Sequence, residues 1–371
     1  MKKKKVMAAL LAGVMAVGLT ACGGTGSSTT AESDTESAAA SESADAEASG
    51  TAEESASEES AEGAADASDI TVAGIVFQDD QFMNMLTQGY VAAAEEYGVN
   101  IMTDNTNNDA AREVELINTY VAQGVDGLAI APLNSDSSVA ALRSADESGM
   151  KIALTNIDLT DADFIVAGYT SNDYDNCYKA GTEAAAILKE KVGDETAKIA
   201  TIQLASQLPD VSKARVDGYL QGLEDGGVKY EVVANQDAWL QDTALEAASS
   251  IITANADLDA IIAINDGGTI GTVTAVQNAG KSDEIMVFGH DGPDQISSMI
   301  LDESSPLQSV VAQDPYGMGY EAMSALIKAI QGEDYSATKG KCEYMEGIIL
   351  SKRDTEAVNS WRVDNGFEAI Q

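Results

Sequence analysis

Short apolar runs alternate with amphipathic stretches from residue 70 onward, and this alternation restricts the possible folds more than any other feature. Runs such as residues 70–77 and 127–131 have the length and apolar character of buried strands. Stretches such as residues 82–97 and 110–123 carry apolar side chains at helical spacing and end at a glycine. Repeated strand–helix units predict an α/β fold whose parallel sheets are covered by helices on both faces.

The alternation occurs in two series. The first series of strands ends near residue 167, and the second begins after a long helix at residues 174–192 and closes with a strand at residues 343–350. About 300 residues exceed what one hydrophobic core normally organises. The sequence therefore predicts two doubly wound parallel-sheet lobes, and ligands of such sheets bind beyond the carboxyl ends of the strands.

Carboxylate, amide and aromatic side chains follow the predicted strands: Asp79, Asp80, Phe82, Asn156, Trp239, Asn265, Asp266, Asp291 and Gln313. Such groups suit a sugar, because carboxylates and amides bind hydroxyls and aromatic rings cover the apolar faces of the sugar ring. Other roles stay open. An Asp or Asn after a strand often caps a helix, Phe82 also fits a core stripe, and Trp239 also fits a surface loop.

Catalytic groups are scarce in this sequence. The chain has one histidine, His290, and it lacks the HExxH, GxSxG, paired CxxC and P-loop lysine motifs. Successive side chains of a strand point to opposite sides, so we expect His290 to point away from the site if Asp291 points into it. Cys177 and Cys342 either form a disulfide or stay free and buried. The sequence predicts no enzyme, no cofactor and no metal site.

Residues 1–22 have the layout of a targeting segment. Lysines at positions 2–5 precede an apolar run at residues 6–18 that is too short to span a membrane. The residues LTAC at positions 19–22 resemble the bacterial lipobox, and the alternative is an ordinary secretory cleavage site. The resemblance implies that Cys22 is lipidated and anchors the protein to the outer face of the cytoplasmic membrane.

Residues 23–69 form a low-complexity tract of Ser, Ala, Glu, Thr and Asp with 13 acidic residues and no basic ones. Such a tract has too little apolar surface to fold, so it predicts a disordered stalk. Residues 70–371 contain 17 basic and 48 acidic residues, a net charge of −31. This charge argues strongly against nucleic-acid binding.

Five segments together resemble a known family: residues 79–83 (DDQFM), 263–266 (AIND), 279–282 (AGKS), 288–292 (FGHDG) and 312–313 (AQ). They look like the pocket segments of ribose- and galactose/glucose-type periplasmic binding proteins, the type I substrate-binding proteins of ABC importers. The resemblance covers residues 70–350 in order. It implies a sugar site made of Asp80, Phe82, Asn156, Arg215, Trp239, Asn265, Asp291 and Gln313.

The residues Phe82 and Trp239 would hold the sugar ring between them, and together with Asp80 and Asn156 they are more similar to the galactose/glucose type than to the ribose type. Two departures from the family pattern stand out. Ile157 occupies the position of an arginine in the ribose type. The family arginine of the second lobe falls near Lys213 or Arg215, because residues 203–212 align poorly. We prefer Arg215, whose planar fork suits hydroxyl contacts better than a lysine.

The family also implies a hinge of three crossovers, expected near Ser171, Gln313 and Lys341. The first lobe would then contain residues 70–171 and 314–340, and the second residues 172–313 and 341–371. No calcium loop of the kind found in some galactose-type members is recognisable.

The expected function is capture of a monosaccharide in the cleft between the lobes, with hexoses such as galactose or glucose favoured. A monomeric lipoprotein would deliver the sugar to the permease subunits of an ABC importer. One alternative is a receptor for another polar ligand, such as a nucleoside, an amine or a signalling furanone. LacI-type repressors share the fold, but the targeting segment, the acidic charge and the missing DNA-binding helices argue against that class.

Overall fold

The structure, a computed structural model, describes residues 69–133 and 136–370. The predicted signal peptide, the lipidated Cys22 and residues 23–68 of the predicted stalk lie outside these ranges and stay predictions. Among the helices of the described ranges, none is both long enough and apolar enough to cross a membrane.

The first sheet has six strands in the order β11-β5-β4-β3-β1-β2, and all neighbouring strands are parallel. Its central strand β3 is buried along its whole length, as expected of a strand with helices on both faces. The strands are β1 (Thr71–Val76), β2 (Asn100–Asn105), β3 (Gly127–Ile130), β4 (Lys151–Asn156), β5 (Ala167–Ser171) and β11 (Cys342–Met345).

The second sheet also has six strands, in the order β12-β10-β9-β8-β6-β7. Its strands are parallel except for β12, which is antiparallel to β10. The strands are β6 (Thr196–Gln203), β7 (Lys229–Asp237), β8 (Ala260–Ala263), β9 (Met286–His290), β10 (Leu307–Ala312) and β12 (Ile348–Ser351).

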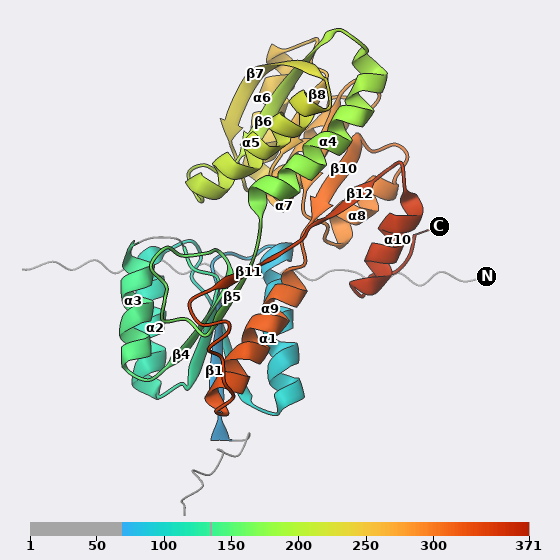
Figure 1. Cartoon of the computed structure of the whole chain (residues 1–371). Coiled ribbons are helices and arrows are strands. Elements are labelled where there is room, and N and C mark those ends of the chain that lie inside the picture. The colour runs from blue at the N-terminus through green and yellow to red at the C-terminus, as the bar shows by residue number, and fades with distance from the viewer. Residues whose placement is uncertain (1–68, 134–135, 371) are drawn as a thin grey trace, which may run out of the picture. The chain divides into compact units, whose positions relative to one another are not determined.

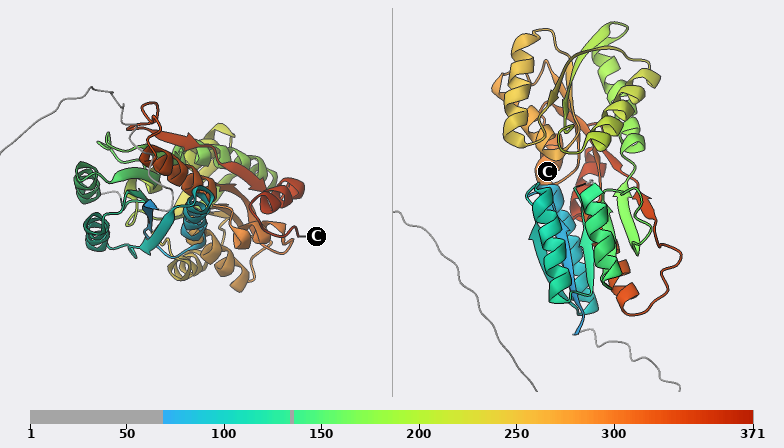
Figure 2. Two further views of the ribbon diagram at one scale, coloured as in Figure 1. Left: turned by 90° about the horizontal axis from the view of Figure 1, so that it is seen from below. Right: turned by 90° about the vertical axis from the view of Figure 1, so that its left-hand side faces the viewer.

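Helices cover both faces of each sheet (Figure 1; Figure 2). In the first lobe, α1 (Gln81–Tyr97) packs beside α9 (Pro315–Ile330), and α2 (Ala110–Gln123) packs beside α3 (Asp136–Glu147). In the second lobe, α4 (Asp173–Val192) packs beside α5 (Pro209–Asp225), and α6 (Gln241–Ala254) packs beside α7 (Asp266–Asn278). The helices α8 (Asp294–Leu301) and α10 (Thr355–Asp364) also contact each other. The predicted two-lobed α/β fold is confirmed.

The predicted last strand differs from the structure. Residues 343–350 were expected to form one strand, but β11 pairs with β5 in the first sheet and β12 pairs with β10 in the second. The chain changes sheets at residues 346–347, where a Cβ on Gly347 would lie 2.6 Å from Val311 Cγ2. Residues 342–345 therefore belong to the first sheet, although the predicted boundary near Lys341 puts them in the second lobe. An apolar run shows that a strand exists but not which sheet it joins.

The chain crosses between the sheets at two further places. One lies between β5 and α4, beside Ser171, and the other lies between β10 and α9, beside Gln313. Three connections therefore join the two sheets within the described residues.

Helices α1 and α9 approach each other closely through glycines. A Cβ on Gly319 of α9 would lie 2.2 Å from the backbone oxygen of Leu86, and one on Gly89 of α1 would lie 2.2 Å from that of Tyr316. Both distances are too short for a real contact, so either glycine can be replaced only if the helices move apart. This packing holds α1 in place, and the residues that start α1 lie at the site described below.

We therefore expect Gly319→Ala to lower the free energy of unfolding by about 1–3 kcal/mol, the usual cost of overpacking. Glu321→Ala is the matched control, because Glu321 lies exposed on the same helix and should change stability by less than about 0.5 kcal/mol. Urea unfolding measures both. Equal stability of the two variants would contradict the close packing of α1 and α9.

Candidate functional site

A cavity lies where strand ends of both sheets meet, and we call it the inner cavity. Residues from both the first lobe and the second lobe line it. Its lining consists of Phe77, Gln78, Asp80, Phe82, Met83, Asn156, Leu204, Gln207, Leu208, Arg215, Asn265, Asp266, Asp291 and Gln313. Seven of the eight residues predicted from the sequence are in this lining, and Trp239 is not.

The junction of β1 and α1 supplies the first group. Asp80 is the N-cap of α1, and its Oδ1 accepts a hydrogen bond from the backbone N–H of Met83 at 2.7 Å. Its Oδ2 accepts from the side chain of Gln78. Phe82 follows in the first turn and is only 7% exposed. Asp80 therefore caps a helix and lines the cavity at once, so the two roles considered for it are compatible.

Two further residues at the carboxyl ends of strands have a left-handed backbone. Asn156 ends β4 with φ 63°, and Asp291 follows β9 with φ 68°. Among residues with a side chain, Asn and Asp tolerate this conformation best. Each carries its polar group to the carboxyl end of its sheet, where the inner cavity lies.

The start of α7 supplies two polar residues from the second lobe. Asn265 is the N-cap, and its Oδ1 accepts from the backbone N–H of Gly268 at 3.2 Å. Asp266, the next residue, is 4% exposed and lines the cavity. The sequence suggested Asp266 as the N-cap, but the structure gives that role to Asn265 and leaves the Asp266 carboxylate at the cavity.

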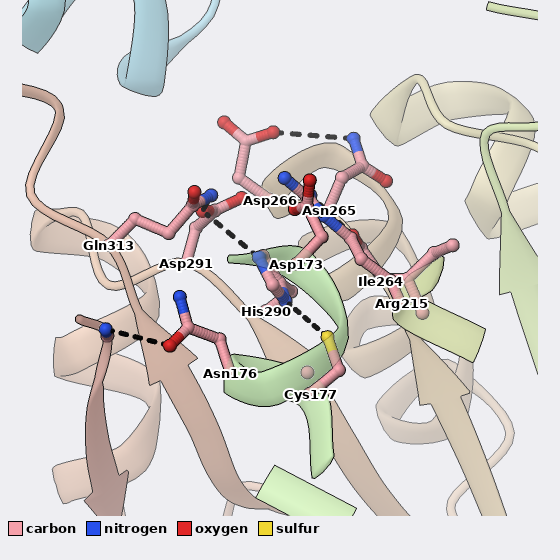
Figure 3. A network of polar contacts seen from close by, with 12 residues as sticks. Asp173, Asn176, Cys177, Arg215, Ile264, Asn265, Asp266, His290, Asp291 and Gln313 are labelled. Carbon is pink, nitrogen blue, oxygen red and sulfur yellow. Dashed lines mark hydrogen bonds and ion pairs between the residues drawn. The ribbon is translucent and has the colours of Figure 1, made fainter. Parts of the chain in front are cut away.

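Of the two basic candidates, only Arg215 lines the cavity. Its Nε donates to Asp173 Oδ1 at 2.7 Å, and its Nη1 donates to the backbone oxygen of Ile264 at 2.9 Å (Figure 3). The side chain of Lys213 is 75% exposed and pairs with Asp217. The guanidinium of Arg215 is thus held in place, and much of its charge is offset by Asp173.

Asp291 and Gln313 form a buried pair at the ends of β9 and β10. Gln313 Nε2 donates to Asp291 Oδ1 at 2.7 Å. The other amide atom, Gln313 Oε1, is buried and has no hydrogen-bond partner within the described part of the chain. A buried acceptor without a donor is costly, so this atom marks a position where a ligand donor would stabilise the site.

A second layer lies behind this pair (Figure 3). His290 is fully buried, and its Nδ1 lies 3.4 Å from Cys177 Sγ on α4. It is absent from the cavity lining, but its Nε2 lies 3.9 Å from Asp291 Oδ1, so its ring is beside the Asp291 carboxylate. Burial lowers the pKa of His290 and raises that of Cys177, so both are neutral. Cys177 and Cys342 are both free.

The three carboxylates of the cavity influence one another. Burial, together with the nearby carboxylate of Asp266, raises the pKa of Asp80 to about 7. Burial also raises the pKa values of Asp266 and Asp291; Asp291 raises that of Asp266, while Arg215 lowers that of Asp291. Like charges in a desolvated site explain all three directions. The cavity is therefore rich in acceptors whose charge is incompletely balanced.

Trp239 lies in a neighbouring depression, which we call the outer groove. The outer groove is larger than the inner cavity and shares Gln78, Asp80 and Asp266 with it. The other residues of its lining are Asp79, Gln81, Asn107, Asn108, Trp239, Leu240, Gln241, Asp242, Thr243, Gly267 and Ile270. The predicted contact of Trp239 with a ligand in the inner cavity stays a prediction.

Side-chain hydrogen bonds join the lobes beside the cavity. Gln207, from the segment before α5, donates to Gln78 and, at 2.7 Å, to Asn108 Oδ1. Gln81 Nε2 donates to Gln295 Oε1 at 3.0 Å. The polar lining residues that the sequence did not single out include Gln78 and Gln207. Gln78 lies in the connection just after β1 and fits the strand-end rule, whereas Gln207 lies in the poorly aligned segment and gave no signal.

Comparison with known proteins places this arrangement in a family. The periplasmic binding protein domain family matches residues 70–334. The ABC transporter periplasmic-binding protein YphF of Escherichia coli K12 is 27% identical over 72% of this chain and 82% of its own length. The ribose import binding protein RbsB of Salmonella typhimurium is 27% identical over 74% of this chain and 88% of its own length.

Solved structures show the same fold. A periplasmic solute-binding protein of an ABC transporter from Actinobacillus succinogenes, solved with bound D-allose, superimposes with a TM-score of 0.69 at 20% identity. The match covers 78% of this chain and 99% of that protein. These relatives are binding proteins rather than enzymes, and the family match covers well over half of the chain. The chain therefore belongs to the periplasmic binding protein domain family, as a binding protein and not an enzyme.

Proposed function

We propose that this protein captures a monosaccharide outside the cytoplasm and delivers it to the permease subunits of an ABC importer. Hexoses such as galactose or glucose are the favoured ligands. In this proposal residues 1–22 are the signal peptide, Cys22 carries the lipid anchor to the cytoplasmic membrane, and residues 23–69 are the stalk. The protein acts as a monomer. Relatives named for ribose and D-allose binding support the sugar class.

The observation that carries the proposal is the surplus of buried acceptors in the inner cavity. Asp80, Asp266 and Asp291 line it, and Gln313 Oε1 has no donor among the described residues. A neutral sugar brings several hydroxyl donors without a charge of its own, so it satisfies these acceptors. Apolar side chains of the lining, such as Phe82, cover the C–H faces of the ring.

The two lobes also explain how binding changes the protein. The site is complete only when strand ends of both sheets contribute to it, so the ligand binds the closed arrangement more tightly than an open one. This difference in affinity drives closure. Gln207 forms hydrogen bonds from the second lobe to Gln78 and Asn108 of the first, and these bonds exist only when the lobes are together. The permease would therefore recognise the closed form, which carries a ligand, and not the open form, which is empty.

A second candidate ligand is a small cationic amine. The specific observation in its favour is the charge balance of the cavity, where three carboxylates face one arginine that is already paired with Asp173. A cation would relieve the repulsion that raises the pKa values of these carboxyls.

We expect neutral monosaccharides to raise the melting temperature more than matched amines do. A ligand at 100 times its Kd adds about 2.7 kcal/mol of stability, which a thermal-shift screen detects. The decisive pairs are glucose with glucosamine and galactose with galactosamine, tested beside D-ribose, D-allose and nucleosides. Larger shifts with the amines would replace the first proposal by the second.

In the same assay Asp291→Asn should weaken binding of the best sugar by about ten- to a hundredfold, because hydrogen bonds to a charged group contribute about 1.5–3 kcal/mol. Asparagine keeps the shape and accepts the left-handed backbone at this position. Asp283→Asn, at an exposed position, is the control and should bind normally. Normal binding by Asp291→Asn would contradict the assignment of the inner cavity.

We also expect sugar affinity to fall as the pH is lowered from 8 to 5. The Asp80 carboxyl has a pKa of about 7, and its protonated form is a poorer acceptor. The loss at pH 5 should be about ten- to a hundredfold. Without a ligand, the folding stability depends on pH in the opposite direction. The raised pKa of Asp80 contributes stability that is fully present below pH 3.8, the ordinary pKa of this carboxyl, and that is lost as the pH rises through about 7.

Titration calorimetry at several pH values measures this dependence, and Asp80→Asn is the matched variant. Asparagine still caps α1, so the helix should stay intact while the pH profile becomes flatter. A wild-type affinity that is constant between pH 5 and pH 8 would show that Asp80 does not titrate on binding.

The proposed anchor makes a separate prediction. Cys22→Ala should release the protein from the membrane fraction or leave an uncleaved precursor. Two acyl chains anchor a protein stably to a membrane, and the variant would carry no acyl chain. Cys342→Ala is the control and should stay in the membrane fraction. A correctly cleaved Cys22→Ala protein that remains bound to membranes would exclude lipid anchoring at this residue.

A further inference from the structure

We infer that the outer groove is a second sugar subsite, so that the protein takes a disaccharide with one ring in the inner cavity and the other on Trp239. This inference rests on the proposed sugar-binding function and extends it to a ligand of two linked rings. It concerns mainly residues that line the outer groove but not the inner cavity.

The first support is continuity between the two depressions. Gln78, Asp80 and Asp266 line both of them, so the two depressions adjoin at these side chains. Gln207 of the inner cavity is bonded to Gln78 and to Asn108 of the outer groove. A ring in the inner cavity and a ring in the outer groove would therefore lie on either side of the shared residues, close enough for a disaccharide to link them.

The second support is that the outer groove, like the inner cavity, lies between the lobes. The first lobe contributes residues 78–81 together with Asn107 and Asn108, and the second contributes residues 239–243 with Asp266, Gly267 and Ile270. Any ligand in the outer groove therefore contacts both lobes. Such a ligand favours closure in the same direction as a ring in the inner cavity.

The third support is the chemistry of the lining. Trp239 offers a large aromatic surface that is only partly buried, and neighbouring Leu240 is 49% exposed. Amide and carboxylate side chains surround them: Gln78, Asp79, Gln81, Asn107, Asn108, Gln241 and Asp242. An aromatic face with a rim of acceptors and amides is what a sugar ring needs, since its C–H face is apolar and its hydroxyls lie around the edge.

Trp239 is also held in position. Its Nε1 donates to Ser206 Oγ at 3.3 Å, and its backbone oxygen accepts from Asn265 Nδ2 at 2.8 Å. Asn265 lines the inner cavity, so one side chain connects the two parts of the site. A fixed aromatic ring loses little conformational entropy when a ligand stacks on it.

The residues shared by the inner cavity and the outer groove would lie beside the glycosidic bond that joins the two sugar rings. Asp80 and Asp266 lie at the junction and can accept hydroxyls from either ring. The glycosidic oxygen would pass beside Gln78, whose amide is the shared group that can donate to it.

The test compares monosaccharides with disaccharides by titration calorimetry on the full chain. The probes are D-glucose, D-galactose, lactose, melibiose, maltose, cellobiose and gentiobiose. We expect at least one disaccharide to bind more tightly than either of its component sugars. Trp239→Ala should weaken that disaccharide about tenfold, clearly more than it weakens the component monosaccharides, while Trp239→Phe should restore most of the loss.

Three outcomes are distinguishable. If monosaccharides bind and every disaccharide is excluded, the outer subsite is wrong and the proposed function stands. If Trp239→Ala weakens monosaccharides as much as disaccharides, Trp239 serves the inner cavity and the outer subsite is again wrong. If no sugar of either kind binds the wild-type protein, the proposed function itself fails. Thermal unfolding of Trp239→Ala without ligand shows that the variant is folded.

Discussion

Three carboxylates, on Asp80, Asp266 and Asp291, line one cavity, and they repel one another there. The nearest compensating charge, on Arg215, is also bound to Asp173, so it does not neutralise the group. The closed arrangement without a ligand is therefore electrostatically unfavourable. In the proposed function, a ligand that donates hydrogen bonds would remove this cost, so the same groups would provide affinity and would favour separation of the lobes in the empty protein.

Much of this site could be predicted because parallel sheets place functional groups by a simple rule. Asp80, Asn156, Asn265, Asp291 and Gln313 each lie at the end of a strand or in the connection that follows it, and the carboxyl ends of parallel strands gather at one edge. Helix capping did not conflict with this role, since the carboxylate of Asp80 and the amide of Asn265 each cap a helix from the cavity lining.

The parts that could not be predicted depend on partners distant in sequence. Gln207 lies in a connecting segment, and its position at the cavity follows from bonds to Gln78 and Asn108 in the other lobe. Trp239 satisfies the same strand-end rule as its neighbours but lies one depression further out. The last apolar run gave no sign that β11 and β12 belong to different sheets, because strand pairing is decided by the partner's unpaired edge.

The left-handed backbone at Asn156 and Asp291 has a consequence for how ligand preference can change. A residue with a branched or bulky side chain would be strained at either position, so only asparagine, aspartate and glycine are readily accommodated. Substitution at these two positions can therefore only exchange an acid for an amide, or replace either residue by glycine, without straining the backbone. A new preference among ligands must therefore arise from neighbours with ordinary backbones, such as Phe82, Gln207 or Trp239, while these two positions remain nearly invariant in shape.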